Sequence, residues 1–283
     1  MIKLCNFKKE TNTMKQVAPL RYDVIFKKAF SVPEVFNAFV RDFLNIEFEV
    51  DTVETDKTYT PAIGNVAAKF DLYAQDKKNR VIVDMQHVRY PDHYHRFLHY
   101  HCAALLEQTV KSRDYRPKLK IFTLVILTSG DKHKKDICVI DFDPKDLQGN
   151  PIGEIDHKII YICPKYLNKE LTPSKYHQWM EAIEDTLDEE VEESKYTLPA
   201  IQRVFKIIEK DQVTPEERAI MFDEYGEEEI KKEGFKEGLK EGITQNIHDT
   251  VLRMYKKGLD IKMIAEIAGI AKKQVNEILI KNK

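Results

Sequence analysis

The sequence lacks the features of a membrane, secreted or zinc-framework protein. Among its 283 residues, no apolar run approaches the roughly 18 residues that a membrane-spanning helix needs. The first 16 residues lack the apolar centre of a signal peptide. Its four cysteines are scattered, without a C-x-x-C pair: Cys5, Cys102, Cys138 and Cys163. We therefore expect reduced thiols in a soluble, cytoplasmic protein without membrane contact.

The chain also has little net charge. Its 45 basic and 47 acidic residues are interspersed and give a net charge of −2, so no basic stripe indicates a nucleic-acid surface. Any site for a polyanion must therefore be local. Hydrophobic residues make up 42%, which is enough for one large domain with appendages or for two domains.

Periodic patterns predict an α/β core between residues 17 and 170, after a loose arm over residues 1–16. Apolar residues recur at helical spacing in three segments, 22–30, 33–44 and 93–113. Three further segments are apolar and β-branched runs typical of strands: 119–128, 137–142 and 158–162. The run 119–128 is expected at the centre of the sheet, buried on both faces. The order of these segments predicts a mixed sheet flanked by helices.

After residue 170 the pattern becomes helical and highly charged. Helices are expected over 174–195, 199–210 and 215–225. A four-residue repeat then places glycine once per helical turn, at Gly234, Gly238 and Gly242. Because glycine costs a helix about 1 kcal/mol relative to alanine, this stripe indicates close helix–helix contact, as in a homodimer, or a flexible helical connector. We therefore separate a helical region, 171–230, from a tail, 231–283.

The end of that tail, residues 258–279, has the pattern of a helix-turn-helix. Apolar residues define a face on each of two short segments, and Gly269 lies between them. Such helix pairs occur in DNA-binding proteins and in structural caps. The short, acidic second segment favours a structural or oligomerising role.

The chemically most informative segment is 69–86, KFDLYAQDKKNRVIVDMQ. Two strand-like runs flank the polar turn 76–79, which predicts a hairpin with Asp71 opposite Asp84. Cross-strand Cβ atoms lie roughly 4.5–5.5 Å apart, and like charges at such positions are destabilising. Two facing carboxylates therefore indicate a bound divalent cation. The alternative is two solvated acids on an exposed sheet face.

Strict alternation along the two strands places Lys69, Asp71, Asp84 and Gln86 on one face of the hairpin. Mg²⁺ prefers oxygen ligands and typically takes one or two protein carboxylates together with waters and substrate phosphate. This face offers that number of carboxylates. The main-chain carbonyl of Met85 is a further candidate ligand.

The spacing of these acids resembles the PD-(D/E)xK nuclease signature, in which two acids and a third polar residue lie on a hairpin. More closely, the chain resembles the recombination-promoting nuclease (Rpn) and transposase group of bacteria. Five segments carry the similarity: Asp23-Val24-Ile25-Phe26-Lys27, Phe43-Leu44-Asn45, Phe70-Asp71-Leu72, Asp84-Met85-Gln86 and Arg96-Phe97-Leu98-His99-Tyr100. The resemblance implies a restriction-endonuclease-like α/β fold. It also implies cleavage of DNA with Mg²⁺, Mn²⁺ or Ca²⁺ as cofactor, in a setting of recombination or mobile elements.

By the same resemblance, Asp71 and Asp84 hold the metal, and Gln86 occupies the position where lysine is usual. Asp84 stands where glutamate is commoner, so its reach is one methylene shorter. Glutamine can hydrogen-bond a water but cannot ionise. We hypothesise that Lys69, opposite Gln86, supplies the missing charge and completes the catalytic set.

Residues of two helices are further candidates. Asp23 would be an additional metal ligand, the alternative being an ion pair with Lys27 at i,i+4. Arg96 and Tyr100 are four residues apart and would contact the DNA backbone, the alternative being packing on the sheet.

Histidines cluster in the same region, but their pattern does not predict a zinc site. His95 and His99 have helical spacing, yet no H-E-x-x-H pattern, matching acid or cysteine accompanies them.

The leading interpretation is a metal-dependent DNA endonuclease. A catalytically weak nuclease fold that binds DNA or a protein is the second. An assembly role of the acidic and glycine-repeat helices is the third.

Overall fold

The computed structural model describes residues 14–59, 67–88, 90, 92–108 and 116–281. The chain divides into two compact units, Met1–Met221 and Phe222–Lys283, and each is described by itself. Most of the expected N-terminal arm, Cys5 and the end of the helix predicted to reach residue 113 lie outside the described residues.

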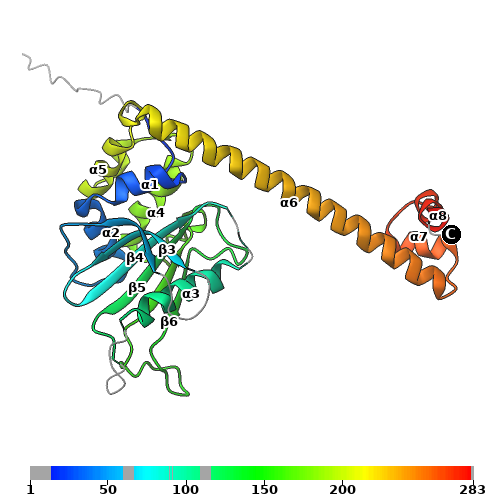
Figure 1. Cartoon of the computed structure of the whole chain (residues 1–283), viewed down its shortest axis with the longest axis horizontal. Helices are drawn as coiled ribbons and strands as arrows, with labels where there is room; N and C mark the ends of the chain where they lie inside the picture. Colours follow the sequence, from blue (N-terminus) through cyan, green and yellow to red (C-terminus); the bar gives the residue numbers. More distant parts are fainter. Residues whose placement is uncertain (1–13, 60–66, 89, 91, 109–115, 282–283) are drawn as a thin grey trace, which may run out of the picture. The chain divides into compact units, whose positions relative to one another are not determined.

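The first unit contains a mixed six-stranded sheet with the order β2-β3-β4-β5-β7-β6 (Figure 1). Strands β4, β5 and β7 run parallel, and the other pairings are antiparallel. The strands are β2 (Glu54–Tyr59), β3 (Ala68–Gln75), β4 (Asn79–Gln86), β5 (Lys120–Leu127), β6 (Ile137–Asp141) and β7 (Lys158–Ile162). The predicted central strand is confirmed, because β5 lies between β4 and β7 and seven of its eight residues are buried. The sequence did not predict β2, whose residues ETDKTY show no apolar alternation.

Helices cover both faces of this sheet (Figure 1). One face packs against α1 (Asp23–Phe30), α2 (Pro33–Leu44), α4 (Ser174–Thr186) and α5 (Pro199–Ile207). The other face packs against α3 (His93–Leu106). Three short 3₁₀ helices connect elements: η1 (Pro164–Tyr166), η2 (Glu193–Lys195) and η3 (Lys210–Gln212). The expected mixed sheet flanked by helices is therefore confirmed.

The larger core is centred on aromatic side chains of α1, α2 and α4. The rings of Phe39 and Trp179 meet edge to face at 5.2 Å, and so do those of Phe30 and Phe39. The buried indole of Trp179 donates a hydrogen bond to Asp42 at 2.6 Å. Consequently α4 shares a core with the sheet, although it follows the domain boundary predicted at residue 170. The domain boundaries expected from the sequence, at residues 16, 170 and 230, remain predictions.

The helix predicted over residues 174–195 is shorter than expected, because α4 ends at Thr186. Glu189 adopts a left-handed backbone conformation with φ of 64°, and β8 (Glu190–Val191) then pairs with β1 (Lys15–Gln16). Val191 is fully buried in the main core. Its burial outweighs the helical preference of the acidic run.

In the second unit, the predicted helix pair is confirmed as α7 (Ile261–Ala268) and α8 (Lys272–Lys281). Asp260 caps α7 by accepting hydrogen bonds from two backbone N–H groups, and Gly269 ends it with φ of 65°. The pair packs on the end of α6 through a small core of Val251, Ile264, Ala265 and Val275. No helix in the described part of the chain is long and apolar enough to span a bilayer.

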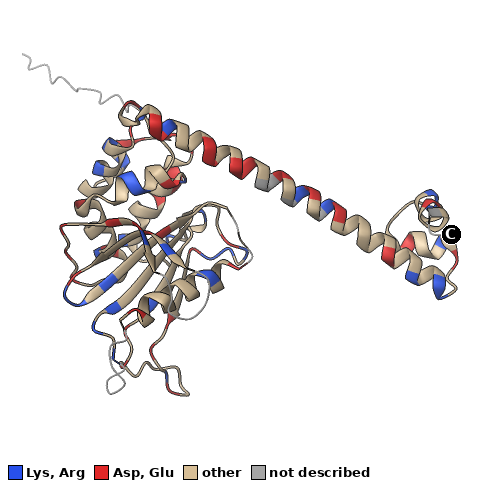
Figure 2. Cartoon of the chain, viewed as in Figure 1, with Lys and Arg blue, Asp and Glu red and all other residues tan. Residues whose placement is uncertain are grey.

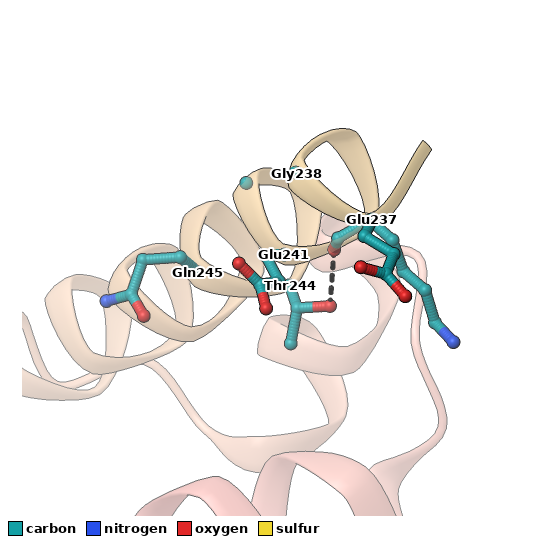
Figure 3. A pocket seen from close by; sticks show the side chains of 7 residues that line it. Glu237, Gly238, Glu241, Thr244 and Gln245 are labelled. Atoms are coloured by element: carbon teal, nitrogen blue, oxygen red, sulfur yellow. Dashed lines mark hydrogen bonds between the residues drawn. The ribbon is translucent and has the colours of Figure 1, made fainter. Parts of the chain in front are cut away.

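The helix predicted from residue 215 does not end at 225 but continues through the glycine repeat as α6 (Pro215–Lys256). A hollow along this repeat is lined only by residues of α6, from Glu237 to Gln245, and Figure 3 shows their side chains on the helix. A Cβ atom at Gly234, Gly238 or Gly242 would meet nothing within 4 Å among the described residues. The stripe therefore packs against no described part of this chain, and both interpretations of it remain predictions.

We expect Gly238→Ala to stabilise α6 by about 1 kcal/mol, because alanine restricts the unfolded backbone and has open space here. Thermal unfolding followed by circular dichroism, with light scattering for the mass, measures this effect. Gly226→Ala is the matched control, since Gly226 also lies in α6 with open space around it but outside the stripe. Dissociation of a dimer by Gly238→Ala alone would instead show that the stripe is a helix–helix interface.

Candidate metal centre

The centre is built on the hairpin of β3 and β4. Backbone pairing runs from Gln75 opposite Arg80 to Leu72 opposite Val83, which confirms the predicted register and four-residue turn. In the turn, the carboxylate of Asp76 accepts hydrogen bonds from two following backbone N–H groups. The ladder ends there, one residue before Asp71 and Asp84, and these two acids are brought together by hydrogen bonds of their carboxylates.

Beyond Leu72 and Val83, the two carboxylates replace backbone groups as hydrogen-bond partners across the hairpin. The backbone N–H of Asp71 donates to Asp84 Oδ1 at 3.2 Å. The backbone N–H of Met85 donates to Asp71 Oδ2 at 3.0 Å. Each acid is therefore held by the main chain of the opposite strand, and the pair is fixed at the end of the ladder.

The regular polar face predicted for the hairpin is wrong, because alternation along β3 is interrupted at Asp71. Phe70 packs in the core beneath α3, whereas Leu72 packs in the core beneath α1 and α2. Strict alternation would place both on one face. The neighbouring strand β2 is irregular at the same place, since Asp56 has φ of 56° and the pairing with β3 passes over Asp56 and Asp71.

Both acids are shielded from water. Asp84 is 4% exposed, and the side chain of Asp71 is 22% exposed. Burial, reinforced by the charge of Asp71, raises the pKa of Asp84 well above its ordinary value. Burial, reinforced by the charge of Asp23, raises the pKa of Asp71 to about 6. The alternative of two solvated acids is therefore wrong for this pair.

The donor set fits a hard divalent cation. Asp84 Oδ2 is buried and, among the described residues, has no hydrogen-bond partner. An acceptor in that situation costs free energy unless a proton or a cation is bound to it. Within the described ranges, no three histidine, cysteine or acidic side chains gather as a metal cluster. Two carboxylates are nevertheless enough for Mg²⁺, which takes its other oxygen ligands from water and substrate phosphate.

A lysine from α1 lies against this pair. Lys27 Nζ lies 2.6 Å from Asp23 Oδ2, 2.7 Å from Asp56 Oδ1 and 3.9 Å from Asp71 Oδ1. Burial opposes its charged form, but the hydrogen bonds to Asp23 and Asp56 outweigh burial and raise the pKa of Lys27. The ion pair that was the alternative for Asp23 is thus present. Sequence reasoning missed Asp56, since nothing marked β2 as a strand.

Lys69 and Gln86 do not meet as the hairpin register suggested. Lys69 is 60% exposed and forms an ion pair with Asp56 at 2.7 Å. Gln86 donates from Nε2 to the Val88 carbonyl at 2.7 Å and accepts at Oε1 from Arg96 at 2.6 Å. The catalytic roles given to Lys69 and Gln86 stay predictions.

The candidate DNA-binding residues of α3 lie beside the centre and also pack on the sheet. The guanidinium of Arg96 lies 4.7 Å from the ring centroid of Phe97 and 5.9 Å from that of Tyr100. Tyr100 meets the ring of Phe70 edge to face at 5.9 Å. The packing alternative is therefore realised for Tyr100, and contact with DNA remains a prediction for both.

The sheet order, the helices on both faces and the acid pair at the end of the hairpin define a restriction-endonuclease-like α/β protein. A family model described as PD-(D/E)XK nuclease family transposase matches residues 20–228, and the chain belongs to this family. Comparison with curated proteins found no match, and comparison with solved structures found none either.

We expect Asp84→Asn to raise the melting temperature of the metal-free protein at neutral pH by a few degrees. The folded-state pKa values of Asp71 and Asp84 exceed the ordinary value of 3.8, so these two acids hold more protons in the folded protein than in the unfolded chain above about pH 4. The contribution of this acid pair to the stability of the metal-free wild type therefore falls as the pH rises from about 4 towards neutrality, whereas the lowered pKa values of His101 and His157 act in the opposite direction. The variant lacks one of the two acids, so its melting temperature relative to the wild type should rise over this pH range.

Differential scanning fluorimetry over this pH range, with EDTA or with excess Mg²⁺, measures both effects. Mg²⁺ should stabilise the wild type and not Asp84→Asn, because a ligand stabilises the state that binds it. Asp51→Asn, which changes an exposed acid, is the control. An unchanged wild-type melting temperature with Mg²⁺ would count against a cation at this pair.

Proposed function

We propose that the protein is a metal-dependent DNA endonuclease that hydrolyses phosphodiester bonds, in a setting of recombination or mobile elements. The observation that carries this proposal is the pair formed by the buried Asp84 and the half-buried Asp71, with one oxygen of Asp84 lacking a partner among the described residues. Membership in the PD-(D/E)XK nuclease family transposases supports it.

In this proposal, Asp71 and Asp84 bind Mg²⁺ or Mn²⁺, with Ca²⁺ as a further candidate, and the Met85 carbonyl is an additional ligand. When bound, such an ion polarises the scissile phosphate and lowers the pKa of a water. The hairpin main chain orients both carboxylates through the N–H groups of Asp71 and Met85. Asp23 is a weaker candidate ligand, because its carboxylate already binds Lys27 at 2.6 Å.

Basic side chains that could contact the DNA backbone are gathered in only a few places on the described surface. Figure 2 shows basic and acidic residues interspersed along the described elements. One hollow of about 760 Å³ is lined by five basic residues, together with acids and apolar groups: Lys77, Lys78, Arg116, Lys118 and Lys120. It lies near the beginning of β4 and β5, whereas Asp84 lies near the end of β4. This hollow is therefore a candidate contact for a polyanion away from the acid pair, and Arg96 is a basic residue on the α3 side of the centre.

The second candidate function is a catalytically weak nuclease fold that binds DNA or a protein. The observation that favours it is the state of Gln86, whose amide is bound to Val88 and Arg96 and cannot ionise. Homodimerisation through the C-terminal helices is a separate proposal, to which the glycine stripe is relevant.

We expect the purified protein to nick or linearise plasmid DNA with Mg²⁺ or Mn²⁺ and to be inactive with EDTA. Asp71→Ala and Asp84→Ala should each lower the cleavage rate on the order of 100-fold or more, because each removes a ligand of the ion. A gel-based assay over a series of metals measures this loss. Both variants should still bind DNA in a mobility-shift assay with Ca²⁺.

The outcomes separate the candidate functions. DNA binding without cleavage in the wild type selects the second candidate. Cleavage that survives in both alanine variants would assign the activity to a contaminant or to another site. Absence of both binding and cleavage would leave assembly as the function of this chain.

A further inference from the structure

The third position of the nuclease motif carries no positive charge in this protein. Gln86 cannot ionise, and both ends of its amide are engaged, with the Val88 carbonyl and with Arg96. Phosphodiester hydrolysis builds negative charge on the phosphate, and a fixed cation at that place stabilises it. Another residue must therefore supply the cation if the centre is to cleave DNA efficiently.

Within the described part of the chain, Lys27, Lys69 and Arg96 lie near the acid pair, and Lys69 and Arg96 are poorly suited to this role. Lys69 is 60% exposed and is anchored to Asp56, so solvent screens its charge. Arg96 is tied to Gln86 and lies over the rings of Tyr90 and Phe97, at 5.2 and 4.7 Å from their centroids. Its guanidinium therefore orients Gln86 on the α3 side of the centre.

Lys27 differs from both in position and in burial. Its side chain is 12% exposed, and it lies on α1, which is fixed in the main core by Ile25, Phe26, Ala29 and Phe30. Asp23 and Asp56 accept two of the three hydrogen bonds that an ammonium can donate. The distance from Lys27 Nζ to Asp71 Oδ1 is 3.9 Å, which is too long for a hydrogen bond. Among the described residues, the third N–H of Lys27 thus has no acceptor within hydrogen-bond distance, and it is left for a water or phosphate oxygen beside Asp71.

We propose that Lys27 supplies the positive charge that the third motif position lacks, facing the scissile phosphate and the attacking water at the Asp71–Asp84 centre. This inference rests on the nuclease function proposed above. Asp23 and Asp56 act as positioning residues that hold the ammonium in place and keep it charged. The left-handed backbone of Asp56, unusual for a residue with a side chain, brings its carboxylate to this point.

A purely structural role would make Lys27 a link between α1 and β2. The two roles differ in their effect on metal affinity. An ammonium 3.9 Å from a ligand oxygen repels a cation bound there, so its removal should tighten binding of a divalent ion. Loss of a structural link would loosen the centre, and metal binding would weaken together with cleavage.

The test compares Lys27→Met with Lys28→Met. Lys28 is the next residue of α1 and is also engaged, 2.7 Å from Glu217 and 2.6 Å from the Gln212 carbonyl, but it lies away from the acid pair. We expect Lys27→Met to lower plasmid cleavage on the order of 100-fold or more. Mn²⁺ affinity, measured by calorimetry, should stay equal or become tighter. Lys28→Met should match the wild type in both assays, and Lys27→Arg should recover part of the cleavage.

Three results would overturn the proposal: wild-type cleavage by Lys27→Met, parallel loss of Mn²⁺ affinity and cleavage in that variant, or a larger loss in Lys69→Met than in Lys27→Met. The nuclease proposal fails separately, if the wild type does not cleave with any metal. In that case the Mn²⁺ titration still decides whether Lys27 lies at the cation centre.

Discussion

The candidate metal centre depends on one electrostatic constraint, the placement of two carboxylates at the point where the β3–β4 ladder ends. Neither can be fully ionised at low cost, because burial and mutual repulsion favour the protonated forms. The surrounding groups reduce this cost: two backbone N–H groups fix the oxygens, and Lys27 brings a positive charge from α1. What remains is an attraction for a divalent cation, which is the physical basis of the proposed chemistry.

The acid pair could be predicted from sequence because its determinants are local. A polar turn between two strand-like runs sets the register of a hairpin, and the register sets which side chains face each other. The cation beside the pair could not be predicted in this way. Lys27 reaches it through the packing of α1 on the sheet, and Asp56 comes from a strand without apolar alternation. The hypothesis about Lys69 relied on regular alternation, which is interrupted at Asp71.

The difference between local determinants and contacts with distant parts of the chain also explains which elements of the fold could be predicted. Long periodic segments such as α2 and β5 were recognised almost to the residue, since burial of their apolar positions determines them. The predicted ends of two helices, at residues 195 and 225, were wrong. The acidic run after Thr186 leaves the helix because Val191 is buried beside β1, and α6 continues through its glycines between good helix formers.

The position of the acid pair on a hairpin also bears on how the protein folds. A hairpin closes a short loop and forms within microseconds, whereas the parallel pairing of β4 with β5 must wait for the longer crossover through α3. We therefore expect Asp71 and Asp84 to meet early, while water still surrounds them. Their dehydration belongs to the later docking of α1 and α3, so a divalent cation present during folding would act on the last step of assembly rather than on the first.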